Sequence, residues 1–186
     1  MSVIFRLLPK ISVAVAAVIS MFFQVNIAFS APQLSPLEIT ADHEVIYCTT
    51  GPVPITDKVK QALNEGTPVI FSWEIIIDEV NDYWIDDAIG SITVVRQAVP
   101  DLISKSWLLT DTSSGISQRV YSVEEVIQFL SRLQNFPTLD RSLLTSGTLY
   151  SFRIKLHIHE GELSDSWWSE ATRFGKTVAL EEVALP

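Results

Sequence analysis

The sequence predicts an α+β fold, a mostly antiparallel, sandwich-like β-sheet with two short amphipathic helices. Several segments after residue 36 alternate apolar and polar side chains with a period of two, which is typical of strands with one buried side. Two short segments instead repeat apolar residues at helical spacing behind a capping residue. No low-complexity tract, glycine-rich linker or long block of charge marks a boundary, so residues 31–186 are expected to form a single domain.

Residues 1–30 have the three zones of a secretory signal peptide. Two basic residues precede an apolar run, and small residues close it at Ala28 and Ser30. We expect cleavage before Ala31 and therefore a periplasmic or secreted, exported protein. The alternative is an uncleaved segment that anchors the domain in the inner membrane, because residues 11–29 approach the length that spans a bilayer. Polar residues dilute that stretch and no basic stop follows it, which favours cleavage.

The first strand is predicted over residues 37–47. Its apolar side chains fall on one face, at Leu37, Ile39, Ala41, Val45 and Tyr47. Glycine and prolines over residues 51–54 end it. A short helix is then predicted from the N-cap Thr56 to a stop at Gly66. Its apolar residues at helical spacing are Val59, Ala62 and Leu63.

The middle of the chain predicts a run of further strands. Residues 69–77 have apolar side chains on both faces, which is typical of a central strand. An alternating stretch over residues 89–99, broken by Pro100, and a segment over 102–109 predict two more. A turn cluster then precedes a short strand over 116–121.

The second helix is predicted to start at Ser122. Ser122 and Glu125 have the S-x-x-E spacing of a capping box, in which each side chain satisfies a main-chain N–H group. The predicted buried stripe consists of Val123, Val126, Ile127, Leu130 and Leu133. A hairpin is then predicted from strands over residues 139–144 and 149–159, and a last strand over 177–183. The inward side chains of the second hairpin strand are Phe152, Ile154, Leu156 and Ile158.

The charge of the chain argues against nucleic acid as a partner. The 186 residues include 13 Lys and Arg against 22 Asp and Glu, a formal net charge of −9. Two of the basic residues belong to the leader, so residues 31–186 hold 11 basic and 22 acidic side chains, a net charge of −11. A phosphate-binding surface needs a basic patch, and an anionic membrane surface would repel this domain. Contact with a membrane is therefore expected only if the N-terminal segment is uncleaved.

Several motifs occur in an order that resembles a known family. The run VKQALNEGTPVIF over residues 59–71 is followed by WIDD over 84–87, YSVEEV over 121–126 and LYSFRIKL over 149–156. This order resembles a bacterial exported family known as domain of unknown function 4390, over roughly residues 37–163. The resemblance implies an exported bacterial domain without an established activity. It also implies a candidate partner, because some genomes encode such a domain beside a membrane sensor kinase.

The sequence lacks the usual signatures of catalysis and cofactor binding. A serine elbow, a CxxC pair, HExxH, a P-loop and GxGxxG are all absent, so no catalytic residue and no cofactor is predicted. His157 and His159 share a strand face, but two ligands do not make a metal site, so no metal is predicted. Cys48 is the single cysteine, which excludes an intramolecular disulfide, and its strand-like context favours a small buried hydrophobe.

Three of the five tryptophans lie outside the strand pattern, at Trp84, Trp167 and Trp168. Trp73 and Trp107 lie within apolar strands and are expected in the core. Exposed aromatic side chains are frequent anchors of protein interfaces. We therefore predict a non-enzymatic protein-binding or accessory module of the cell envelope, which contacts an envelope protein through these three residues. The simpler interpretation is that they cap the ends of the sandwich.

A carbohydrate- or glycan-directed enzyme is the alternative function. The acidic residues beside the exposed tryptophans are Asp86, Asp87, Asp165 and Glu170. Two catalytic carboxylates of a glycosidase face each other across the substrate, about 5 to 10 Å apart, and one has a raised pKa. The sequence does not show this arrangement. Enzyme activity therefore remains the alternative, and the sequence favours a binding domain over an enzyme.

Overall fold

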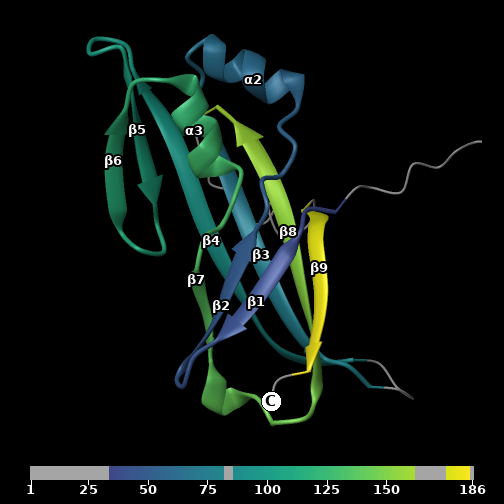
Figure 1. Cartoon of the computed structure of the whole chain (residues 1–186). Coiled ribbons are helices and arrows are strands. Elements are labelled where there is room, and N and C mark those ends of the chain that lie inside the picture. The colour runs from purple at the N-terminus through teal and green to yellow at the C-terminus, as the bar shows by residue number, and fades with distance from the viewer. Residues whose placement is uncertain (1–33, 82–85, 162–174, 185–186) are drawn as a thin grey trace, which may run out of the picture. The chain divides into compact units, whose positions relative to one another are not determined.

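The computed structural model describes residues 34–81, 86–161 and 175–184. These residues form nine strands in two antiparallel sheets, two α-helices and one short 3₁₀ helix (Figure 1). The predicted α+β fold with a mostly antiparallel, sandwich-like sheet is therefore confirmed. The predicted signal peptide lies outside the described residues. Within the described ranges, no helix has the length and hydrophobicity needed to cross a membrane.

The larger sheet has six strands in the order β6-β5-β4-β3-β8-β9. In chain order, its strands are β3 (Val69–Glu79), β4 (Asp87–Asp101), β5 (Ser106–Asp111), β6 (Ile116–Val120), β8 (Leu149–Glu160) and β9 (Lys176–Ala184). The smaller sheet has the order β1-β2-β7. Its strands are β1 (Leu37–Ala41), β2 (Val45–Thr50) and β7 (Phe136–Asp140). The helices are α2 (Asp57–Asn64), the 3₁₀ helix η2 (Arg141–Leu143) and α3 (Val123–Leu130).

Strand β3 lies in the middle of the larger sheet, as its apolar sequence predicts. It pairs along its whole length with β4 on one side and β8 on the other. Its inward side chains are all fully buried: Val69, Phe71, Trp73, Ile75 and Ile77. The core positions predicted for Trp73 and Trp107 are also confirmed, with 0% and 8% of each residue exposed.

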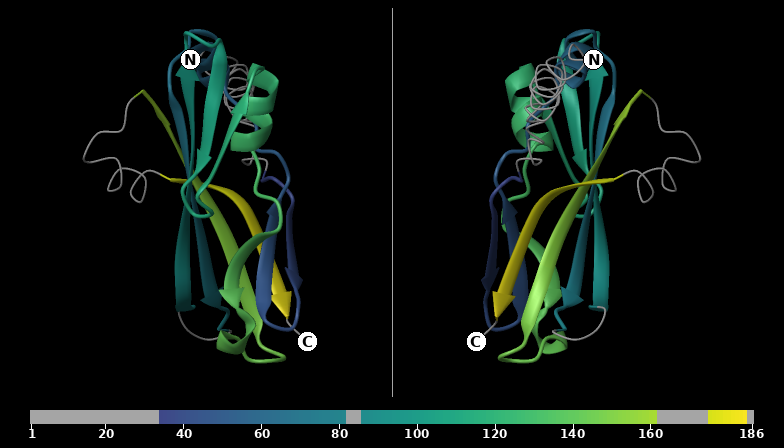
Figure 2. Two further views of the ribbon diagram at one scale, coloured as in Figure 1. Left: turned by 90° about the vertical axis from the view of Figure 1, so that its left-hand side faces the viewer. Right: turned by 90° about the vertical axis from the view of Figure 1, so that its right-hand side faces the viewer.

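The smaller sheet and α3 cover the same face of the larger sheet, as Figure 2 shows from the side. Val126 and Leu130 of α3 are fully buried in one apolar cluster with Leu109 of β5. This cover ends before the outermost strand. Residues opposite each other in an antiparallel pair share a face, so Gln118 lies on the same face as its partner Leu109, yet Gln118 is exposed. The inner face of β6 is therefore open to solvent at Ile116 and Gln118, while Val120 at the end of the strand is buried.

Both predicted helices form with the predicted caps. The hydroxyl of Thr56 accepts a hydrogen bond from the N–H of Val59, and the predicted residues of α2 are buried. Gly66 follows with φ of +72°, a left-handed conformation that favours glycine. In α3, Ser122 and Glu125 form both hydrogen bonds of the capping box.

Removing the cap of α3 should destabilise the domain moderately. We expect Ser122→Ala to lower the free energy of unfolding by about 1 kcal/mol, because the N–H of Glu125 loses the hydroxyl that accepts its hydrogen bond at 3.2 Å. Urea denaturation followed by tryptophan fluorescence measures the change. Ser146→Ala, at an exposed turn residue, is the matched control and should leave the midpoint unchanged. Equal midpoints for both variants would contradict the prediction.

The predicted single strand over residues 37–47 is wrong, because the segment is a hairpin of β1 and β2. The carboxylate of Asp42 accepts hydrogen bonds from the N–H groups of Glu44 and Val45, which closes a tight turn. Because of the turn, the buried positions of β2 are even-numbered, whereas the predicted single strand had odd-numbered positions buried. Ile46 and Cys48 are buried in β2 instead of Val45 and Tyr47.

The predicted strand over residues 102–109 starts too early. Pro100 is still within β4, opposite Trp107, and the chain then turns over residues 102–105 before β5 begins. Asp101 fixes this turn by accepting hydrogen bonds from the N–H groups of Ile103 and Ser104, both at 3.1 Å. Ile103 is consequently 98% exposed.

The predicted hairpin between residues 139–144 and 149–159 is also wrong. Residues 141–143 form η2, which the carboxylate of Asp140 caps, and β7 pairs with β2. Strand β8 pairs with β3 and β9 in the other sheet. Residues 145–148 do lie in a connection between two strands, as predicted, but the two strands belong to different sheets and do not pair with each other. The inward residues predicted for β8 and the last strand, β9, are confirmed.

Candidate protein-binding groove

The residues predicted to bind a partner, Trp84, Trp167 and Trp168, lie outside the described residues. Of the acidic residues considered for a glycosidase, Asp165 and Glu170 also lie outside them. Asp86 and Asp87 are exposed and accept hydrogen bonds from Asn81, both at 3.3 Å. Both carboxylates are therefore exposed groups that interact with Asn81, just after β3.

The residues weighed for metal and thiol chemistry have structural surroundings. Within the described ranges, no group of three or more His, Cys, Asp or Glu could hold a metal ion. His157 and His159 pair with Ser72 and Ile70 of β3 on the outer face of the larger sheet. Cys48 is fully buried, and this burial raises the pKa of its thiol to about 12. The prediction that Cys48 is a small core residue is confirmed.

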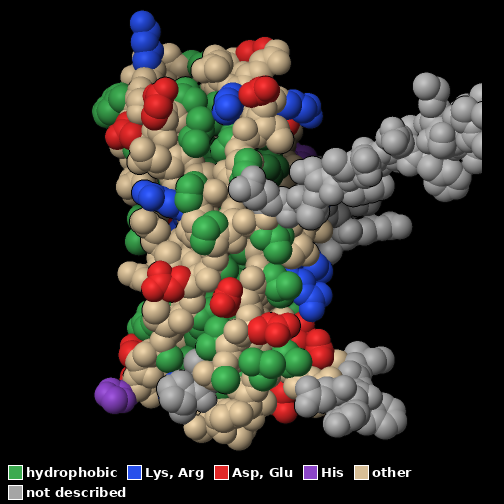
Figure 3. Space-filling model, turned by 45° about the vertical axis from the view of Figure 1, so that its right-hand side comes forward, with side chains coloured by type: hydrophobic (Ala, Val, Ile, Leu, Met, Phe, Trp, Pro, Cys, Tyr) green, Lys and Arg blue, Asp and Glu red, His purple; other side chains and the backbone are tan. Residues whose placement is uncertain are grey.

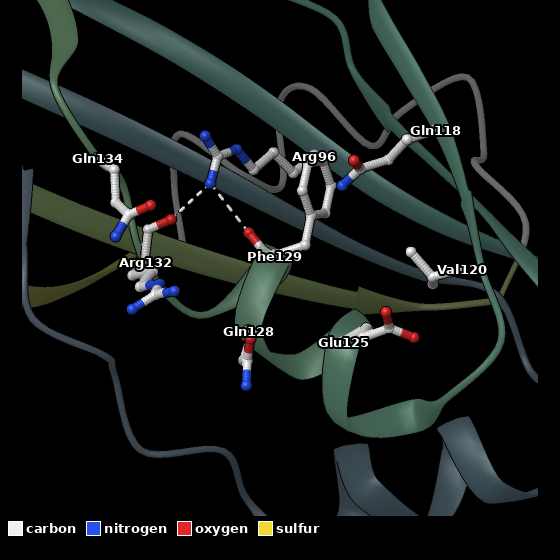
Figure 4. Close-up of a pocket in the computed structure, with 8 residues that line it drawn as sticks. All are labelled: Arg96, Gln118, Val120, Glu125, Gln128, Phe129, Arg132 and Gln134. Carbon is white, nitrogen blue, oxygen red and sulfur yellow. Dashed lines mark hydrogen bonds between the residues drawn. The ribbon is translucent and has the colours of Figure 1, made fainter.

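A groove opens between β6 and the end of α3, where the cover of the larger sheet stops. It consists of two pockets, of about 410 Å³ and about 480 Å³, that share Arg96, Phe129 and Gln134. The first pocket is further lined by Gln118, Val120, Glu125, Gln128 and Arg132 (Figure 4). The second is further lined by Asp111, Ser113, Ser114, Ile116, Asn135, Phe136 and Pro137. We call the two pockets together the β6 groove.

Arg96 forms the common wall of both pockets. It lies on the inner face of β4, opposite the buried Phe71 of β3, and only 13% of its side chain is exposed. Its Nε donates to the carboxylate of Asp111 at 2.9 Å. Its Nη1 donates to the carbonyls of Phe129 and Arg132 at the C-terminal end of α3, where a cation also interacts favourably with the helix dipole. Arg96 thus fixes α3 to β4 and β5.

The two acidic residues of the groove both accept hydrogen bonds from within the chain. Burial acts to raise the pKa of Asp111, but hydrogen bonds from Ser113 and Arg96 and the charge of Arg96 outweigh it, so this pKa lies below its ordinary value. Hydrogen bonds from the hydroxyl of Ser122 and the N–H groups of Tyr121 and Ser122 lower the pKa of Glu125. Both groups are therefore ionised at neutral pH and are poor general acids.

Strand β6 has a free edge beside the groove. It pairs with β5 on one side and has no partner strand on the other within the described sheet. The other sheet edges are interrupted in places: β7 contains Pro137, which lacks an N–H group, and the N–H of Ser35 beside β1 donates to the carbonyl of Val178 in β9 at 2.7 Å. The free edge of β6 can therefore accept another strand.

The sequence contained a signal for Arg96 that the strand prediction did not use. Val94 and Ala98 are inward-facing and fully buried, and Arg96 occupies the inward position between them. A charged side chain at an inward-facing position of a strand needs a hydrogen-bonding or ionic partner inside the fold. Its partners Asp111 and α3 are distant in the sequence, so the groove itself was not predictable.

Comparison with known families agrees with the motif order of the sequence. The profile described as domain of unknown function, DUF4390, matches residues 30–167, which covers every strand and helix described here except β9. The chain belongs to the DUF4390 family. No curated protein and no solved structure matches it. The resemblance noted in the sequence is thus confirmed, and the DUF4390 family assigns no activity to the β6 groove.

Proposed function

We propose that this protein is an exported, non-enzymatic module that binds an extended segment of another cell-envelope protein in the β6 groove. The observation that carries the proposal is that a groove with unused hydrogen-bond donors runs beside a free strand edge. Each pocket has a volume in the range of ordinary ligand sites, about 300 to 1,000 Å³. By contrast, the face in Figure 3 mixes acidic, basic and hydrophobic side chains and does not single out a site.

The chemistry of the groove suits a polypeptide main chain. A peptide in extended conformation presents N–H and C=O groups to a free strand edge and directs alternate side chains into a neighbouring groove. The amides of Gln118, Gln128 and Gln134 can each donate and accept hydrogen bonds, as peptide groups require. Ile116, Phe129 and Phe136 add apolar surface in the second pocket. Such a mixture fits a peptide better than a reacting substrate.

The export of the module is supported by the three-zone leader and by the resemblance described above. An exported domain contacts other proteins of the cell envelope, and a membrane sensor kinase is one candidate binding partner. The glycan-directed alternative gains no support, because Asp86 and Asp87 are exposed and the carboxylates of the groove are engaged with internal donors.

Photocrosslinking in cells tests the proposed site. Gln134 lines both pockets and is exposed, so p-benzoylphenylalanine at this position should crosslink to the partner. The matched control is the same substitution at Gln61, an exposed residue of α2 outside the groove. We expect one discrete crosslinked product from position 134 and none from position 61.

Two further positions separate this site from the one predicted by sequence. The photoreactive residue at Trp84 or Trp167 tests the tryptophans predicted to bind a partner. A crosslink at these positions and none at Gln134 would favour the tryptophans and contradict the groove. Products of equal yield at Gln134 and Gln61 would show non-specific contact and would also reject the groove.

A further inference from the structure

We infer that the segment bound in the β6 groove is acidic, with carboxylates that meet the guanidinium groups of Arg96 and Arg132. This inference rests on the proposed function and adds the chemistry of the ligand. It starts from the balance of donors and acceptors that the groove leaves unused.

The carboxylates of the groove already accept hydrogen bonds from within the chain. Asp111 accepts hydrogen bonds from Nε of Arg96 and from the N–H groups of Ser113 and Ser114. Glu125 accepts from the hydroxyl and N–H groups of Ser122, at 2.8 and 3.2 Å. An incoming donor at Asp111 or at Oε2 of Glu125 would therefore have to compete with bonds that already hold the turn after β5 and the start of α3.

The donors of the groove are not consumed. Nη2 of Arg96 makes no hydrogen bond with the described residues, and the Arg96 side chain lines both pockets. The guanidinium of Arg132 likewise has no hydrogen bond or ion pair in the described part of the chain, and it lines the first pocket. Unused donors on two cations select an anionic acceptor.

The guanidinium of Arg96 and the main chain of Arg132 are held in one unit. Three hydrogen bonds, to Asp111, Phe129 and Arg132, fix the guanidinium of Arg96, and its carbon lies 5.0 Å from the centre of the Phe129 ring. Because Arg96 also holds the carbonyl of Arg132, the main chain that carries the second guanidinium is fixed as well. A donor that is already in place, as the guanidinium of Arg96 is, costs little conformational entropy when a ligand binds.

The net charge of the chain adds specificity. The domain, residues 31–186, has a net charge of −11 and repels an acidic segment over most of its surface. The β6 groove offers such a segment two guanidinium groups, and its own carboxylates, Asp111 and Glu125, already accept hydrogen bonds from within the chain. An acidic segment is therefore oriented toward the groove, while a basic segment would be drawn to many other places on the surface.

Selection from a phage-displayed library of random peptides on the immobilised full-length chain tests the inference. We expect the enriched peptides to share at least one Asp or Glu. Changing that residue to Asn or Gln in a fluorescein-labelled synthetic peptide should weaken binding by about tenfold or more, the effect of a charge-assisted hydrogen bond. Fluorescence polarisation measures the affinity, which should also fall as salt concentration rises.

Variants of the protein identify the cations involved. Arg132→Gln should weaken binding of the acidic peptide by about tenfold and should leave its amide counterpart unaffected. Arg96→Lys keeps a charge beside Asp111 and removes Nη2, and it should also weaken binding, with thermal unfolding measured in parallel to establish that the domain is folded. Lys176→Gln, at an exposed residue of β9, is the control and should bind as the wild type does.

Gln134→Trp, which fills the junction of the two pockets, separates the two proposals. Enriched peptides without a shared acidic residue, whose binding Gln134→Trp abolishes, would overturn the acidic ligand and leave the groove as the binding site. Peptides whose binding is unaffected by Gln134→Trp, or a selection without enrichment, would overturn the proposed function and this inference together.

Discussion

Replacing Arg96 with methionine should lower the free energy of unfolding by about 3 to 5 kcal/mol, the usual cost of breaking a buried ion pair by removing one partner. Asp111, with 7% of its side chain exposed, would remain as a buried charge without its counterion. The carbonyls of Phe129 and Arg132 would lose their donor at the same time. Because a domain of this size has a total stability of about 5 to 15 kcal/mol, urea denaturation should show a large shift.

The loss of stability in Arg96→Met should depend on pH. In the wild type the pKa of Asp111 lies below its ordinary value, so the ion pair contributes stability above about pH 4, and this contribution is lost as pH falls through the lowered pKa. Without the guanidinium, the raising effect of burial is opposed less, and the carboxyl protonates at a higher pH. The difference between variant and wild type should therefore be largest at neutral pH and should shrink below about pH 4.

Two companion variants establish the cause. Arg132→Met makes the same change at a neighbouring arginine without a described ion pair, and it should cost less than about 0.5 kcal/mol. Asp111→Leu combined with Arg96→Met removes the orphaned charge and should recover part of the lost stability. Equal losses in Arg96→Met and Arg132→Met would contradict the structural role of Arg96, as would a loss that does not change with pH.

The elements that sequence predicts correctly are those whose signals are local. The capping box of Ser122 and the stop at Gly66 fix the ends of the helices within a few residues. The apolar run of β3 predicts burial on its inner face, whatever its neighbours are. In each case the residues that form the element also contain the information that defines it.

The β6 groove depends on contacts that are distant in sequence. Arg96 bonds to Asp111 and to carbonyls 33 and 36 residues further along the chain. Strand β6 has a free edge because it is the last strand in the order of the larger sheet. The alternation of apolar and polar residues does not encode this order. The prediction of a hairpin over residues 139–159 failed for the same reason. Turn residues indicate that the chain changes direction, but they do not indicate which sheet contains the next strand.

A matched pair of isoleucines tests the difference between local pattern and position in the fold. Ile75 and Ile103 both lie in segments whose sequence predicts a strand, but Ile75 is fully buried and Ile103 is 98% exposed. We expect Ile75→Ala to lower the free energy of unfolding by about 2 to 5 kcal/mol, through lost apolar burial and the cavity that remains. Ile103→Ala should change it by less than about 0.5 kcal/mol.

Chemical denaturation of both variants separates two accounts of the turn after β4. In the structure, Asp101 holds residues 102–105 in a turn, so the side chain of Ile103 contributes nothing to the core. If β5 instead began at residue 102, as the alternation indicates, Ile103 or Leu102 would be buried and its truncation to alanine would cost more than about 2 kcal/mol. Leu102→Ala completes the test, because neighbouring strand residues point to opposite faces and one of the two must then be buried.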